Sequence, residues 1–243
     1  MLTQNENLDI QVLALELDAR LRGLPHPDIP SVRLVRREFS QRIKNAAPQT
    51  VIDLALLLLK DPRFGHRFVA YELVAHHRPA LRTLGESALE ELGWNLDSWQ
   101  SVDTFACYLA GPTWREEQVP DEWVRRWARS PNRWQRRAAL VCTVALNNRA
   151  RGGRGDAART LEICRMLVSD RDDMVVKAMS WALRELVYHD RAAVEAFLQA
   201  QENDLAPRVS REVRNKLATG LKNPKKKETG GYRASGGYRA SGA

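Results

Sequence analysis

Apolar residues recur at the three- and four-residue spacing of an amphipathic α-helix over almost the whole chain. No segment alternates apolar and polar positions between turn dipeptides, as a half-buried β-strand does. The pattern therefore predicts an all-α protein. We expect helices at residues 8–22, 31–45, 48–60, 64–76, 78–91, 98–110, 121–129, 132–147, 157–169, 173–187, 190–200 and 207–220.

Proline, glycine and short polar stretches separate these helices. The predicted breaks fall at Pro25, Pro27 and Pro30, Pro48, Asp61-Pro62, Gly93, Gly111-Pro112, Ser130-Pro131, residues 151–155 and Pro207. Because the connectors are short, neighbouring helices should pack antiparallel.

The helical pattern also repeats along the chain. Arg137-Ala138 aligns with Lys177-Ala178 at a spacing of 40 residues, and an apolar run follows each pair. A helical period near this length is typical of HEAT-type repeats, which bury their faces against one another. We therefore expect a curved HEAT-like solenoid (an α-α superhelix) whose concave groove can hold an extended partner. An irregular helical bundle is the alternative.

The helical pattern ends near Lys222. Three lysines follow Asn223-Pro224, and the remaining residues repeat the sequence GGYRAS. Glycine, serine and arginine cannot build a core. We predict one helical-repeat domain over 1–221 and a disordered, basic, glycine-rich tail over 222–243.

The net charge of +8 is unevenly distributed. Six cations and one acid leave residues 222–243 with +5, and so the rest of the chain with only +3. Between Trp123 and Thr160 the chain has ten arginines, no lysine and one acid, Asp156. Such a stretch favours phosphate contact over diffuse attraction to a membrane. A solvated face of ordinary helices is the alternative.

Three motifs place tryptophan beside charged residues. They are W-x-x-x-D at 99–103, N-x-W-x-R-R-A-A at 132–139 and K-A-x-x-W-A-L-R-E at 177–185. An aspartate one helical turn beyond a tryptophan sets a carboxylate beside an indole face, and this combination suits a cationic partner. Together with the arginine-rich stretch, the motifs predict recognition of a positively charged lesion in DNA.

Other residues are expected to serve packing. We assign four tryptophans, Trp94, Trp123, Trp127 and Trp134, to contacts between repeats. The three cysteines, Cys107, Cys142 and Cys164, lie in apolar patterns without metal-ligand spacing, which indicates buried thiols in a reducing compartment. The histidines are scattered, and no apolar run reaches membrane-spanning length. We expect a cytoplasmic protein, associated with the nucleoid through DNA, without metal or cofactor.

Between Ile29 and Lys216 the motifs resemble the DNA alkylation repair glycosylases of the AlkD family, which are HEAT-like proteins. Residues 99–103 read W-Q-S-V-D where the family has W-D-x-V-D. The second match comprises Trp127-Ala128, Ser130, Asn132, Trp134 and Arg137-Ala138-Ala139. The third covers 177–185, and the last comprises Leu205-Ala206-Pro207 and Ser210-Arg211-Glu212.

The resemblance implies roles for individual residues. Trp99 and Trp181 match the tryptophans that line the lesion cleft, and Asp103 matches the essential carboxylate. Arg137 matches the arginine that holds the DNA backbone near the lesion. Further candidate DNA contacts are Arg184, Arg133 and Arg136.

The implied activity is excision of cationic N-alkylpurines, such as 3-methyladenine and 7-methylguanine, from double-stranded DNA by a monomer that does not flip the base. The chain departs from the family at Gln100, which we expect to be harmless, and at the N-terminal helix. Its first aromatic residue is Phe39, whereas family members place a tyrosine at the cleft from the N-terminal helix. One wall of the cleft is therefore expected to be missing or rebuilt. The alternatives are a non-catalytic helical-repeat protein that binds damaged or branched DNA, and a HEAT-type protein scaffold.

Overall fold

A computed structural model describes residues 9–224, which form helices, turns and bends without a strand. The all-α prediction is confirmed. The α-helices are α1 (Ile10–Arg22), α2 (Ile29–Arg42), α3 (Pro48–Leu58), α4 (Phe64–His76), α5 (Arg78–Thr83), α6 (Glu86–Leu92), α7 (Trp99–Phe105), α8 (Gly111–Arg115), α9 (Asp121–Ala128), α10 (Arg133–Asn147), α11 (Ala157–Met166), α12 (Asp173–Leu186), α13 (Arg191–Ala200) and α14 (Pro207–Thr219). A π-helical turn, η1 (Ala106–Ala110), precedes α8, and a 3₁₀ turn, η2 (Arg149–Arg151), follows α10. None of these helices is long and apolar enough to cross a bilayer.

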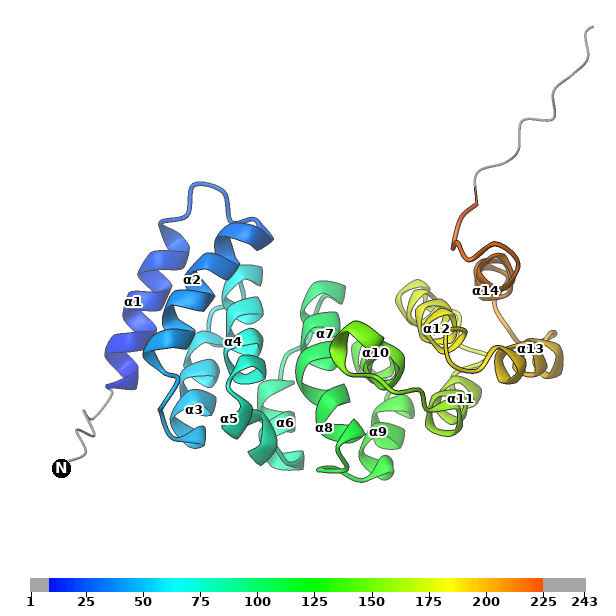
Figure 1. The fold of residues 1–243 in the computed structure, drawn as a ribbon, viewed down its shortest axis with the longest axis horizontal. Coiled ribbons are helices and arrows are strands. Elements are labelled where there is room, and N and C mark those ends of the chain that lie inside the picture. The colour runs from blue at the N-terminus through cyan, green and yellow to red at the C-terminus, as the bar shows by residue number, and fades with distance from the viewer. Residues whose placement is uncertain (1–8, 225–243) are drawn as a thin grey trace, which may run out of the picture.

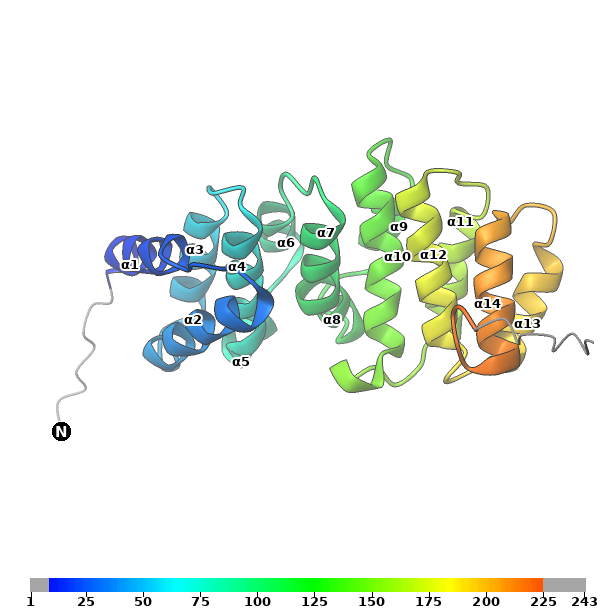
Figure 2. The ribbon, with the colours of Figure 1, turned by 90° about the horizontal axis from the view of Figure 1, so that it is seen from above.

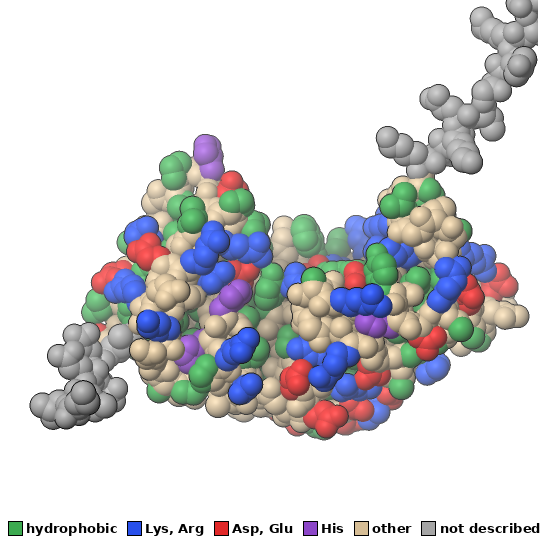
Figure 3. Space-filling view, viewed as in Figure 1, with side chains coloured by type: hydrophobic (Ala, Val, Ile, Leu, Met, Phe, Trp, Pro, Cys, Tyr) green, Lys and Arg blue, Asp and Glu red, His purple; other side chains and the backbone are tan. Residues whose placement is uncertain are grey.

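The helices stack along the long axis of the molecule in a curved array (Figure 1). Figure 2 shows an inner row in which α2, α4, α7, α10, α12 and α14 lie side by side, and each contacts the next. The outer row includes α1, α3, α6, α9, α11 and α13. This arrangement is consistent with a helical-repeat solenoid. The surface is hollowed between the helices at the two ends of the stack (Figure 3).

Helix α10 lies at the centre of the array and contacts α7, α9, α11 and α12. All of its residues from Arg137 to Asn147 are buried. Fully burying one of its valine or leucine side chains contributes about 1.5–3 kcal/mol. The strong packing of this helix gives the neighbouring α7 and α12 fixed positions, and these two helices carry candidate site residues.

The tryptophans assigned to packing divide into two groups. Trp123 and Trp127 are buried, with ring centroids 4.4 Å apart, and Trp127 stacks on Phe105 at 5.7 Å. Trp134 is partly buried against the core, so these three assignments are confirmed. The assignment of Trp94 is wrong, because this side chain lies between α6 and α7 and is 79 % exposed.

The prediction of buried, unpaired cysteines is confirmed for Cys107, Cys142 and Cys164. Burial raises the pKa of the Cys107 and Cys164 thiols to about 12. A thiol with so high a pKa is almost entirely protonated at neutral pH and is a poor nucleophile.

The predicted break at Gly111-Pro112 is wrong. The helix continues from α7 through η1 into α8, and the Gly111 N–H bonds the Ala106 carbonyl five residues back. Gly111 is needed for close packing, because a Cβ there would lie 2.5 Å from Ala145 Cβ on α10. Pro112 directly follows the π-helical turn, at the second position of α8.

Two other helix boundaries also differ from the prediction. Residues 78–91 form two helices, α5 and α6, separated by extended backbone at Leu84 and Gly85. Helix α2 begins before Pro30 rather than after it. The Asp28 carboxylate accepts a hydrogen bond from the Ser31 N–H at 2.9 Å, and Pro30 sits in the first turn, where helices accept proline.

The predicted tail lies outside the described residues from 225 onward. Its first residue, Lys222, contacts the helical domain: the Asn215 side-chain amide of α14 donates to the Lys222 carbonyl at 3.1 Å. The Lys222 ammonium lies 3.4 Å from the Glu212 carboxylate of α14. The domain boundary therefore stays a prediction.

Candidate functional site

Three neighbouring helices of the inner row bring the main candidate residues together. One cavity is lined by Trp99 and Asp103 from α7, Arg137 from α10, and Trp181 and Arg184 from α12. A second cavity of about 450 Å³ shares Trp99, Asp103 and Trp181. The two cavities therefore adjoin, with Asp103 at their common boundary.

Trp99 and Asp103 lie one turn apart on α7, as the spacing predicted. Ser98 caps this helix, and its hydroxyl accepts a hydrogen bond from the Ser101 N–H at 3.4 Å. Trp99 is 50 % exposed, whereas the Asp103 side chain is only 18 % exposed. An open indole therefore stands beside a carboxylate that is largely withdrawn from solvent.

Arg137 holds the Asp103 carboxylate through two parallel hydrogen bonds. Nε donates to Oδ1 and Nη2 to Oδ2, each at 2.8 Å, and Nη1 donates to the Met174 carbonyl at 2.6 Å. Such a paired contact fixes the carboxylate in position as well as in charge. Burial raises the pKa of Asp103, and the hydrogen bonds and positive charge of Arg137 act in the opposite direction.

Trp181 has its own support on α12. Its indole Nε1 donates to Glu185 Oε1 at 3.1 Å, and Glu185 Oε2 lies 3.4 Å from the Asn148 amide nitrogen. Glu185 stands one helical turn beyond Trp181, so the i, i+4 spacing could have identified it. These contacts orient the indole plane toward the shared cavities.

The second cavity has a wall that sequence reasoning did not identify. Ile29 and Arg33 from α2 and Phe64 and Phe68 from α4 line it. This wall comes from α2 and α4, and no residue of α1 lines the cavity. That it replaces the missing N-terminal aromatic residue stays a prediction.

A comparison with known protein families covers most of the chain. A family model described as "DNA alkylation repair enzyme" matches residues 18–217. The chain belongs to this family of DNA alkylation repair enzymes. No curated protein matches it at a significant level.

Family membership confirms the resemblance and supports a role as an enzyme of alkylation repair, with DNA as the substrate. The matched segment contains every candidate site residue. The match does not assign roles to individual residues, so the roles of Asp103, Trp99 and Trp181 stay predictions.

The four arginines selected as DNA contacts in this repair enzyme occupy different positions. Arg137 is only 5 % exposed and faces the cavity beside Arg184, whose Nε donates to the Ser180 hydroxyl at 3.2 Å. Burial lowers the pKa of Arg184. Arg133 and Arg136 line neither cavity. Arg133 lies over the Trp134 ring at 4.8 Å.

Arg136 connects α10 to the loop before α12. Its Nε donates to Asp170 Oδ2 at 2.7 Å, and its Nη1 donates to the Pro131 carbonyl at 2.9 Å. These contacts stabilise the end of the helix. That Arg133 and Arg136 contact DNA stays a prediction.

Most of the arginine-rich stretch is not a free anion-binding surface. Arg125 pairs with Glu162 and Arg126 with Glu90, at sequence separations of 37 and 36 residues. Arg129 pairs with Glu122 at 2.6 Å. The acids stand outside the stretch, largely on neighbouring repeats, so a count of local charges missed them. The charge argument for DNA binding is correspondingly weaker, and the family match carries that inference instead.

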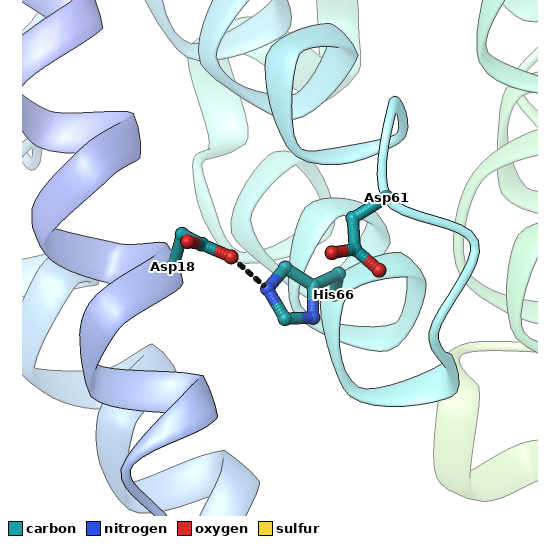
Figure 4. A group of neighbouring side chains, drawn as sticks. All are labelled: Asp18, Asp61 and His66. Carbon is teal, nitrogen blue, oxygen red and sulfur yellow. Dashed lines mark hydrogen bonds and ion pairs between the residues drawn. The ribbon is translucent and has the colours of Figure 1, made fainter.

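A further polar cluster lies near the N-terminal end of the array, between α1 and α4 (Figure 4). Asp18, Asp61 and His66 approach one another closely enough to hold a metal ion, and the His66 Nε2 is 2.8 Å from Asp18. Two arginines already neutralise the carboxylates. Arg22 Nε lies 2.7 Å from Asp18, and Arg63 bonds Asp61 and lowers its pKa. The cluster is an ion-pair network that joins α1 to α4.

Proposed function

We propose that this protein is a DNA glycosylase that hydrolyses the N-glycosidic bond of cationic alkylated purines in base excision repair. Suitable substrates are 3-methyladenine and 7-methylguanine. The observation that carries the proposal is the meeting of Trp99, Asp103 and Trp181 at one opening in a member of a DNA alkylation repair family.

Alkylation at N3 of adenine or N7 of guanine gives the base a positive charge before the enzyme acts. The bond between C1′ and the base can then break with its electron pair passing to the base, which leaves neutral. A general acid to protonate the base adds little. What the enzyme must supply is stabilisation of positive charge on the sugar and a position for the attacking water.

Asp103 supplies both. A carboxylate near C1′ stabilises the oxocarbenium-like sugar, as carboxylates do in glycoside hydrolysis, and can orient the water and accept its proton. Because Asp103 is largely shielded from solvent, its charge acts through a lower effective dielectric than a surface carboxylate would. Arg137 favours the ionised form of the carboxylate and holds it in place, and the guanidinium hydrogens not used by Asp103 and Met174 can contact a flanking phosphate.

Trp99 and Trp181 supply attraction for the cationic base and sugar. A cation over an indole face gains about 0.5–2 kcal/mol, more where solvent is excluded. The Glu185 carboxylate that accepts the Trp181 N–H adds electron density to that indole and so favours a cation further. Both tryptophans would act on cationic lesions and not on neutral bases.

The openness of the site favours chemistry on a base that stays in the duplex. Glycosylases that flip the base hold it in a snug pocket between side chains. Here Trp99 is half exposed at the mouth of the cavity, and Asp103 lies at the boundary between two adjoining cavities. Such a surface can approach the sugar from outside the stack.

The test is release of bases from methylated duplex DNA, comparing the wild type with Asp103→Asn. The amide keeps the size of the side chain and removes its charge. We expect release of 7-methylguanine to fall at least about tenfold, or roughly 1.4 kcal/mol of transition-state stabilisation. DNA affinity should change little.

Glu90→Gln is the matched control, since it removes a carboxylate that contacts two tryptophans on the outer row. This variant should excise normally. A wild type that binds methylated duplex without releasing any base would identify the protein as the non-catalytic binder. Equal release by the wild type and Asp103→Asn would contradict the mechanism.

A further inference from the structure

Arg151 and Tyr108 form a pair at the edge of the second cavity. The Arg151 guanidinium carbon lies 4.3 Å from the centroid of the Tyr108 ring, and both side chains line the cavity with Asp103, Trp99 and Trp181. A guanidinium on an aromatic face is held in place without losing its charge. Arg151 was among the ten arginines of the rich stretch, but nothing in the sequence distinguished it.

The π-helical turn η1 explains why Tyr108 reaches this cavity. In a regular α-helix the residue on the same face as Asp103 is four positions later, at Cys107. The turn from Ala106 to Ala110 inserts an extra residue into the helix and brings Tyr108 to the Asp103 side as well. Such insertions occur often at functional sites.

The tyrosine is also fixed at its hydroxyl. Arg33 Nη2 donates to the Tyr108 oxygen at 3.1 Å. Arg33 is itself neutralised by Glu72, with the Arg33 Nε donating to Glu72 Oε1 at 3.0 Å. The Glu72 carboxylate is buried and also accepts a hydrogen bond from Arg36. The ring on which Arg151 rests therefore has a fixed orientation.

Among the described residues Arg151 has no acidic partner, unlike most arginines of its stretch, and unlike Arg149 and Arg154 it lines the cavity. Within residues 9–224 no ion pair joins its guanidinium to a carboxylate, whereas Arg125, Arg126, Arg129, Arg136, Arg137 and Arg159 each have an acidic partner. The side chain is exposed. The backbone is anchored, because Arg115 donates to the Arg151 carbonyl at 2.9 Å. A positioned, accessible and uncompensated guanidinium at this cavity suits a phosphate.

We propose that Arg151, held on the face of Tyr108, is a DNA-phosphate contact of this site. The inference rests on the proposed role of the cavity in DNA repair. Arg151 would hold the backbone on the α4 side of Asp103, while Arg184 and Lys222 line the cavity on the α14 side. The duplex would then be held on both sides of the reacting sugar, which is what positions a sugar against a fixed carboxylate.

The experiment measures affinity for undamaged duplex DNA as a function of salt, so that it does not depend on excision. Each phosphate contact contributes about 0.9 to the slope of log K against log salt concentration. Arg151→Gln should lower the slope by about that amount and weaken binding several-fold at physiological salt, as loss of one phosphate contact does. Arg151→Lys should keep most of the slope, because it keeps the charge.

Arg154→Gln is the matched control. Arg154 is exposed in the same connector between α10 and α11, it lines neither cavity, and its loss changes the net charge equally. This variant should keep the wild-type slope. Thermal unfolding of both variants shows that each is folded.

Three results would be decisive. Equal slopes for Arg151→Gln and Arg154→Gln would overturn the inference, even if the wild type excises methylated bases. Loss of excision by Arg151→Gln with unchanged DNA affinity would also overturn it, since the residue would then act on the chemistry. A slope lowered only in Arg151→Gln supports the contact, even if the wild type releases no base.

Discussion

The inner site and the outer contact between α6 and α9 are made of the same residue types, yet they differ in what is exposed. On the outer row, Glu90 accepts the indole N–H groups of Trp123 and Trp127 and pairs with Arg126. On the inner row, Trp99 and Trp181 flank Asp103, which pairs with Arg137. Each group has two tryptophans, one acid and one arginine.

The arrangement of burial is reversed between the two groups. The outer tryptophans are buried and their acid stands at the surface, with its side chain 43 % exposed. The inner acid is shielded, and the indoles open into cavities. Buried indoles stabilise the fold, whereas an open indole beside a shielded charge gives up packing energy and keeps a face for a ligand. The residue types alone do not distinguish a packing cluster from a candidate functional site. The exposure of the indoles and of the acid does.

The largest expected difference is in stability. Trp123→Ala leaves a cavity in the core and should lower the free energy of unfolding by about 3–5 kcal/mol. Trp181→Ala removes a partly buried ring and should cost much less, while slowing excision of cationic bases. Denaturant unfolding and base release, measured on both variants, check the contrast. If Trp181→Ala proved as destabilising as Trp123→Ala, Trp181 would belong to the core.

Local patterns predicted much of the site and the fold. Helical periodicity indicated the all-α fold, and the one-turn spacing placed Trp99 beside Asp103. Both predictions rest on residues that are close together in the sequence. The role of Trp94 was misassigned because a tryptophan in a connector has no helical phase to indicate its burial. The π-turn that presents Tyr108 leaves no such pattern either.

Contacts between repeats were harder to predict. Arg137 meets Asp103 across 34 residues, and Arg33 meets Glu72 across 39. Partners at these distances belong to adjacent repeats, and their pairing requires the register of the helices, which one weak internal alignment cannot supply. The sequence therefore predicted an uncompensated positive charge for the arginine-rich stretch, because the acids that pair with it lie outside the stretch.

The next prediction tests the shielded pair itself through pH. Asp103 must be ionised to act, so excision should be lost as pH falls through its pKa. Burial raises that pKa, and Arg137 opposes the rise. Arg137→Gln removes the opposing effect, so the pKa should rise further and the acid limb of the excision profile should move to higher pH.

The measurement is single-turnover release of 7-methylguanine from the acidic to the neutral range, with uncatalysed loss of the base subtracted. The position of the limb is the readout, because loss of a phosphate contact alone would lower the rate at every pH without moving the limb. Glu90→Gln, altered in the outer group, should keep the wild-type profile. An unmoved limb in Arg137→Gln would show that Arg137 does not influence the ionisation of Asp103.

The smallest effect is expected at the C-terminal end, where the chain leaves the inner row. Lys222 lines the cavity with Arg184, whereas residues 225–243 follow it in sequence. Removing 225–243 should leave excision unchanged, because the candidate site residues lie on α7, α10 and α12. DNA binding should weaken at most modestly, because the lost cations contribute only sequence-independent attraction to phosphate. Lys222→Gln in the full-length chain should weaken binding by a similar small factor while leaving excision at saturating enzyme intact. Loss of folding on removal of 225–243 would show instead that these residues belong to the helical domain.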